Sequence, residues 1–247
     1  MDYKVLLTKD KKELIEVHNK ITRESWPEFM LHDSISNNYW TDLFKVFPDF
    51  QFLLTLKNEI VGAANSIPFY WGKNLKELPE EGWNWVLEKG FLDKAKNRKP
   101  NMLSGLQIVI RDKFRGKGIS SIIIKEMIKI TRNKGFRYLI IPVRPSLKSK
   151  YPEISIEEYI GWKRADKLPF DPWIRAHFKL GGKIIKPCHR AMYISGSISD
   201  WENWTDRKFS GKDEYLVKGA LVPIKINYSK NIGEYFEPNV WIAHEIV

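Results

Sequence analysis

The segment 101–143 constrains the fold of this 247-residue chain more than any other part of it. Residues 106–110 alternate as in a β-strand, and apolar residues recur at helical spacing over 119–134. A near-continuous apolar run over 138–143 is typical of a strand buried on both faces of a parallel sheet. The three pieces predict a strand–helix–strand unit with a basic, glycine-containing turn at 115–120 as its first corner.

The turn has the features of an anion-binding site. Gly116 and Gly118 let the backbone approach an anion with no Cβ in the way, and the first turn of the following helix offers free N–H groups. Arg115 and Lys117 add positive charge. These residues predict a phosphate-bearing ligand at this corner.

Two widespread phosphate-binding patterns do not fit the turn. A P-loop requires Gly-x-x-x-x-Gly-Lys-Ser/Thr, which the sequence does not contain. A dinucleotide-binding fold requires a glycine directly after the first strand and an acidic residue at the end of the second. Here residues 112–115 precede the first glycine, and the second strand ends in Val143-Arg144.

A third pattern fits. The run 108–120 resembles the acetyl-CoA signature of the GNAT superfamily of N-acyltransferases, Gln/Arg-x-x-Gly-x-Gly/Ala, which maps onto Arg115, Gly118 and Ser120. Only the serine at the last position departs from it. The run 177–182 resembles a second GNAT motif, Tyr-x-x-Leu-Gly-Phe, with His177 at the tyrosine position and a glycine at the phenylalanine position.

The resemblance implies an α/β (α+β) fold, with a GNAT-type mixed central sheet, flanking helices and a splayed strand before the glycine phosphate turn. We expect a GNAT-like domain over 1–196 with insertions near 72–100 and 146–171, and a C-terminal extension over 197–247 packed on the same body. Besides the unit at 106–143, periodicity predicts strands at 5–7, 51–57, 59–68, 183–186, 191–195 and within 215–226, and helices at 11–25, 38–46, 83–96, 172–180 and 199–204.

The resemblance also implies how an acyl-CoA binds. The turn would hold its pyrophosphate, and the edge of the preceding strand would bind pantetheine and the acyl carbonyl. The residues implied are Ile108, Ile110, Arg115, Gly116, Lys117, Gly118, Ile119 and Ser120. His177 is the candidate general acid or base, because imidazole has a reference pKa of about 6.5; packing or capping of its own helix is the alternative role.

An acyl-CoA-dependent N-acyltransferase follows from the resemblance, most directly one that moves acetyl from acetyl-CoA to the amine of a small molecule without a metal. A GNAT-like module that binds CoA without turnover is the alternative, because Ser120 and His177 depart from the family's usual residues. An RNA-associated protein, suggested only by the net charge of +11, ranks third, since no aromatic platform is interleaved with the basic patches.

Cysteine and histidine usage bears on metals and compartment. Cys188 is the only cysteine, which excludes a disulfide framework and a thiolate metal cluster, and the five histidines have no metal-ligand spacing. The first ten residues lack a signal-peptide pattern, and no apolar run approaches the ~20 residues of a membrane span. We therefore expect a cytoplasmic protein without a metal or a membrane partner.

The aromatic and basic residues do not identify the acceptor molecule. Several tryptophans fall outside the usual GNAT pattern, and they either line an acceptor pocket or, as we favour, cover the sheet: Trp71, Trp83, Trp85, Trp162, Trp173, Trp201 and Trp204. Arg144, Arg164 and Arg175 suit a carboxylate-bearing acceptor and a surface role equally well. The sequence does not indicate an oligomeric state.

Overall fold

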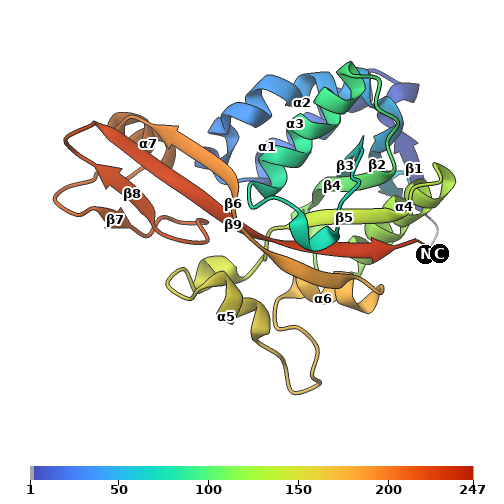
Figure 1. Cartoon of the computed structure of the whole chain (residues 1–247). Helices are drawn as coiled ribbons and strands as arrows, with labels where there is room; N and C mark the ends of the chain where they lie inside the picture. Colours follow the sequence, from blue (N-terminus) through green and yellow to red (C-terminus); the bar gives the residue numbers. More distant parts are fainter. Residues whose placement is uncertain (1–2, 247) are drawn as a thin grey trace.

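Nine strands form one sheet in the computed structural model, which describes residues 3–246 (Figure 1). The strands are β1 Tyr3–Leu7, β2 Gln51–Leu56, β3 Glu59–Phe69, β4 Met102–Ile110, β5 Tyr138–Val143, β6 Lys183–Gly196, β7 Glu214–Tyr215, β8 Ile224–Asn227 and β9 Ile232–Glu245. The α-helices are α1 Glu13–Ser25, α2 Ser34–Val46, α3 Gly82–Ala95, α4 Ile119–Asn133, α5 Ile156–Gly161, α6 Pro172–Lys179 and α7 Ile198–Thr205. Short 3₁₀ turns cover Thr8–Asp10, Glu28–His32, Pro48–Phe50, Leu75–Glu77, Asp112–Phe114 and Lys148–Lys150.

The sheet is mixed, as expected. Its strand order is β1-β2-β3-β4-β5-β9-β8-β7, with β6 paired to β9 off this path. Neighbouring strands are antiparallel except β4 and β5, which are parallel and joined by α4. This is the strand–helix–strand unit that the sequence predicts, although β4 begins at Met102, four residues earlier than the alternation suggests.

Helices cover both faces of the sheet. On one face, Ile21 of α1 packs with Leu53 and Ala63, and α3 lies so close to β3 that a Cβ at Gly90 would come within 2.4 Å of Ile67. On the other face α4 lies against β3 and β4 with α6 beside it (Figure 1). Apolar side chains between these layers form the main core, in which buried tryptophans such as Trp201 take part.

The C-terminal part of the chain completes the sheet. β6 and β9 pair over most of their length, from Lys183↔Ala243 to Gly196↔Gly233, with two irregularities. Val240–Glu245 of β9 pair with β5 and Ile232–Glu234 pair with β8, so Tyr235–Asn239 lie between the end of β5 and the start of β8. The last strand therefore runs from the body into a projecting arm that also carries α7, β7 and β8 (Figure 1).

Most predicted elements lie within a few residues of their observed bounds, with three differences. The short helix α5 lies over Ile156–Gly161, where no helix is predicted. The predicted strands at 183–186 and 191–195 are one strand, β6, because irregular pairing around Cys188–Met192 carries it across the intervening residues. The sequence reading also placed no strand over 232–245, where β9 lies. Among the helices described, none has the length and apolar character needed to cross a membrane.

Candidate active site

β4 and β5 run side by side only at their first residues and then separate. Met102–Ser104 pair with Tyr138–Ile140, and past Ser104 no strand of residues 3–246 pairs with the edge of β4 that faces β5. Gly105 lies at the point of divergence, where a Cβ would come within 2.9 Å of Cγ1 of Ile141. The next residue, Leu106, is an extra residue in the pairing with β3, and such a bulge bends a strand. β4 is thus the expected splayed strand.

A cavity of about 730 Å³ occupies this opening. Its walls come from the end of α1, β4, the glycine turn, the segment after β5, α6 and β9. Of the residues predicted from the sequence, those that line it are Ile108, Ile110, Arg115, Gly116, Gly118, Ile119, Ser120 and His177. Lys117 is not in the lining; its ammonium lies 5.5 Å from the centre of the Phe114 ring.

The glycine turn presents free backbone donors to the cavity. Gly116 and Gly118 have φ angles of 75° and 78°, in the left-handed region that favours glycine. Gly118 precedes the first turn of α4, and no side chain of residues 3–246 caps this helix. Within the described chain no acceptor pairs with the amides of Ile119 and Ser120, whereas Ser121 N–H donates to the Gly118 carbonyl. A helix start with open N–H groups attracts anions.

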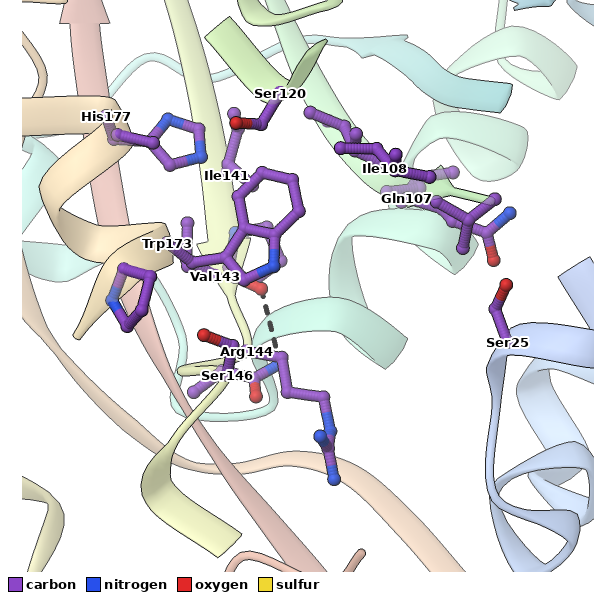
Figure 2. A pocket seen from close by; sticks show the side chains of 18 of the residues that line it. Ser25, Gln107, Ile108, Ser120, Ile141, Val143, Arg144, Ser146, Trp173 and His177 are labelled. Carbon is purple, nitrogen blue, oxygen red and sulfur yellow. Dashed lines mark hydrogen bonds between the residues drawn. The ribbon is translucent and has the colours of Figure 1, made fainter. Parts of the chain in front are cut away.

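His177 lies on α6 and is 1% exposed. Its Nδ1 lies 2.9 Å from Nε2 of His244 on β9, so these two atoms share one hydrogen. Burial, and after it the neighbouring His244, lowers the pKa of His177 to about 3. The ring is therefore neutral at physiological pH, and its Nε2 is the atom left for the cavity. Figure 2 shows His177 and Trp173 on one side of this space and Gln107 on the other.

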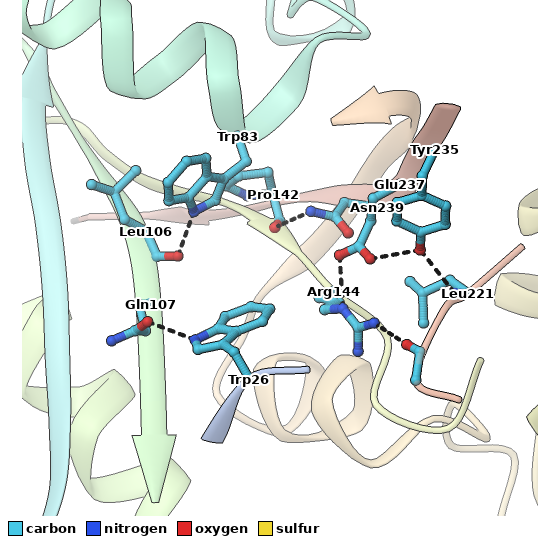
Figure 3. Close-up of polar contacts among 11 residues, drawn as sticks. Trp26, Trp83, Leu106, Gln107, Pro142, Arg144, Leu221, Tyr235, Glu237 and Asn239 are labelled. Carbon is cyan, nitrogen blue, oxygen red and sulfur yellow. Dashed lines mark hydrogen bonds and ion pairs between the residues drawn. The ribbon is translucent and has the colours of Figure 1, made fainter. Parts of the chain in front are cut away.

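Arg144, directly after β5, is fixed at another part of the cavity. Its Nε donates to Oε1 of Glu237 at 2.7 Å, and its Nη2 donates to the Gly219 carbonyl. Glu237 is fully buried, and its Oε2 accepts from the Tyr235 hydroxyl at 2.8 Å (Figure 3). Burial works to lower the pKa of Arg144, but the charge of Glu237 and the Tyr235 hydroxyl raise it overall, so the guanidinium stays charged.

Hydrogen bonds also fix the aromatic walls. Trp26 Nε1 donates to Oε1 of Gln107 at 2.8 Å, and Trp83 Nε1 donates to the Leu106 carbonyl at 2.7 Å. Trp26, Trp83 and Trp173 line the cavity. The tryptophans outside the family pattern thus fit both interpretations: Trp173 lines the cavity, Trp201 packs in the core, and Trp83 belongs to both.

The sequence reading missed the residues that β9 brings to the site. Glu237 and Asn239 are two residues apart on one strand, just before the apolar run Val240–Ala243, and His244 directly follows that run; this pattern was the available signal.

The three arginines considered for a carboxylate-bearing acceptor differ in where they lie. Arg144 and Arg175 line the cavity, whereas Arg164 is exposed and lies 3.7 Å from Asp166.

Comparisons with known proteins agree with this geometry. The sequence model of the Acetyltransferase (GNAT) family matches residues 11–149. The chain is 29% identical over 249 residues to an arginine N-acetyltransferase, avaD, of Aspergillus versicolor, with 90% of this chain and 85% of that protein covered.

Two solved structures share the fold. The loading GNATL domain of CurA from Lyngbya majuscula superposes with a TM-score of 0.63 at 18% identity, covering 100% of this chain and 98% of that one. The GphF GNAT-like decarboxylase in complex with isobutyryl-CoA gives 0.52 at 13% identity over the full length of both chains. At these identities the likeness concerns the fold.

Proposed function

Because the chain belongs to the GNAT acetyltransferase family and is an N-acetyltransferase, we propose that it transfers acetyl from acetyl-CoA directly to the amine of a small molecule bound in the same cavity. The observation that carries the proposal is the opening between β4 and β5, which places free helix-start amides and an unpaired strand edge in one cavity.

The residues present fit a CoA thioester. The amides from Gly116 to Ser120 are placed to hold the pyrophosphate, with Arg115 adding charge. The edge of β4 near Ile108 and Ile110 offers backbone groups to pantetheine and the acyl carbonyl, and an N–H of this edge stabilises the oxyanion that forms on attack. Lys117, which is exposed and outside the lining, contributes charge at the mouth.

The transfer itself exchanges one bond for another. The acceptor nitrogen bonds to the thioester carbon, the carbon–sulfur bond breaks, and CoA leaves as a thiolate. The proton lost by the nitrogen passes to Nε2 of His177 and then to the thiolate, so the enzyme ends unchanged. Burial keeps the ring neutral, so Nε2 is unprotonated before the reaction. A pKa of about 3 disfavours lasting protonation of the ring, so the proton passes on to the more basic thiolate.

The acceptor end of the cavity supports a small molecule. Its walls are the aromatic rings of Trp26 and Trp83 with the side chain of Met192, and its polar groups are those of Arg144, Glu237 and Asn239. This mixture of apolar walls and a few fixed polar groups is typical of small-ligand sites. The curated relative acts on arginine, so we take L-arginine as the first acceptor to test.

The test measures release of free thiol from acetyl-CoA with L-arginine and a panel of other small amines. We expect turnover with at least one of them and an N-acetylated product by mass spectrometry. Saturable binding of CoA without thiol release across the panel would instead favour a CoA-binding module, and absence of CoA binding would reject the family's chemistry for this chain.

A further inference from the structure

Two side chains at the acceptor end have hydrogen-bonding atoms to spare, and they are fixed in place. We infer that the acceptor is an amino acid whose carboxylate pairs with Nη1 of Arg144 and one of whose N–H groups donates to Oδ1 of Asn239. This inference rests on the proposed function and names the class of acceptor for the same cavity.

Arg144 is held as a pre-formed anion site. Glu237 and the Gly219 carbonyl occupy its Nε and Nη2, and Nη1 has no partner among residues 3–246. The side chain remains 20% exposed, and its guanidinium lies 5.8 Å from the centre of the Trp26 ring (Figure 3). Both oxygens of Glu237 are in use, one by Arg144 and one by Tyr235, so this carboxylate serves to position the guanidinium.

Asn239 supplies an unpartnered acceptor. The side chain is 2% exposed and belongs to the cavity lining. Its Nδ2 donates to the Pro142 carbonyl at 3.2 Å, which fixes the orientation of the amide, but its Oδ1 has no hydrogen-bond partner in the described structure. A buried polar atom without a partner is costly, and a ligand N–H that enters the cavity relieves that cost.

Charge at this end favours an anionic group. Arg175 also lines the cavity, and its Nη1 is held by the carbonyls of Pro169 and Phe170. Among the described lining residues, Glu237 is the one carboxylate, against the side chains of Arg115, Arg144, Arg175 and Lys179. Figure 2 shows Arg144 well away from Ser120, so the anion that Arg144 attracts is distinct from the CoA pyrophosphate at the start of α4.

The test compares binding of free amino acids, beginning with L-arginine, with binding of their methyl esters to the CoA-saturated protein by calorimetry. Agmatine, which is arginine without its carboxylate, extends the series. We expect at least one free amino acid to bind and its ester to bind about 10- to 100-fold more weakly, the range of one charge-assisted hydrogen bond. Equal affinity for acid and ester, or binding of no amino acid, would overturn the inference.

Variants separate recognition from folding. Arg144→Lys keeps a charge beside Glu237 but loses the planar fork, so the preference for acid over ester should shrink to near unity. A purely structural role would weaken acid and ester equally. Asn239→Leu, which removes Oδ1, should weaken both by a similar factor and keep their ratio. If the native protein does not bind CoA, the proposed function fails. If it binds CoA but binds the free amino acid no more tightly than its methyl ester, this inference alone fails.

Discussion

Nδ1 of His177 lies 2.9 Å from Nε2 of His244, which joins the helix α6 to the last strand, β9. The contact orients the His177 ring toward the cavity, and burial keeps that ring neutral. The orientation of His177 thus depends on His244, a residue 67 positions further along the chain.

Replacing His177 tests its role in proton transfer. His177→Phe keeps the ring volume but removes Nε2, so kcat should fall about 10²-fold while acetyl-CoA affinity stays the same. His244→Gln is the matched variant, since it retains a polar partner for Nδ1 and should cost less. Steady-state kinetics and calorimetry on both proteins provide the comparison; unchanged turnover in His177→Phe would reduce His177 to a packing residue.

The pH dependence of turnover follows from the low pKa of His177. A histidine base with an ordinary pKa would give a break near pH 6.5 in kcat, whereas His177, with a pKa of about 3, is already deprotonated throughout the range above pH 5. We expect kcat, measured at saturating acceptor from pH 5.5 to 9, to show no histidine-type break. A break near 6.5 that disappears in His177→Phe would contradict the account.

Cys188 should be dispensable for transfer. The side chain is fully buried, and burial raises the pKa of its thiol well above the usual value, so the thiolate needed for an acyl-enzyme is not formed. Cys188→Ala should therefore leave kcat unchanged while it lowers the free energy of unfolding by about 1 kcal/mol through lost packing. An acetylated cysteine trapped in the native protein would argue for a covalent intermediate instead.

His18, remote from the site, predicts sensitivity to acid. It is fully buried between α1 and α2, and burial lowers its pKa to about 4. The unfolded chain takes up a proton near pH 6.5 and the folded chain only near pH 4, so stability falls as the pH drops through this window. His18 alone should remove about 1.5 kcal/mol between pH 6.5 and 5. Urea unfolding of the native protein and of His18→Gln at both pH values measures this loss. If the free energy of unfolding falls by the same amount in both proteins between the two pH values, the prediction is wrong.

Local patterns made part of the site predictable. The unit from β4 to β5 has short-range signals: alternation, two glycines at a turn, helical spacing and an apolar run, all within about 40 residues of sequence. The family resemblance then pointed to Arg115, Gly118 and His177. These residues line one cavity, as the positions of the motifs required.

The rest of the site depends on contacts that the sequence does not display. Glu237 and Asn239 matter because β9 lies beside β5, a pairing between segments about 100 residues apart. The buried state of His177, which sets its pKa, arises from the same strand. Arg144 likewise has no sequence feature that distinguishes it from a surface arginine, because its partners Glu237 and Gly219 lie far away in the sequence.

We propose that the left-handed glycine turn before α4 holds the acyl-CoA. Gly118 and Gly135 flank the same helix, both have positive φ angles, 78° and 69°, and neither would have a neighbour within 4 Å of an added Cβ. Alanine therefore brings a similar backbone strain to both positions, but only Gly118 lies in the cavity.

Calorimetric titration of acetyl-CoA into the native protein, Gly118→Ala and Gly135→Ala is the most direct measurement. We predict that Gly118→Ala weakens binding by about tenfold or more, the equivalent of 1.4 kcal/mol, while Gly135→Ala binds as the native protein does. Equal affinity in all three proteins, or no saturable binding of acetyl-CoA to the native chain, would contradict the account.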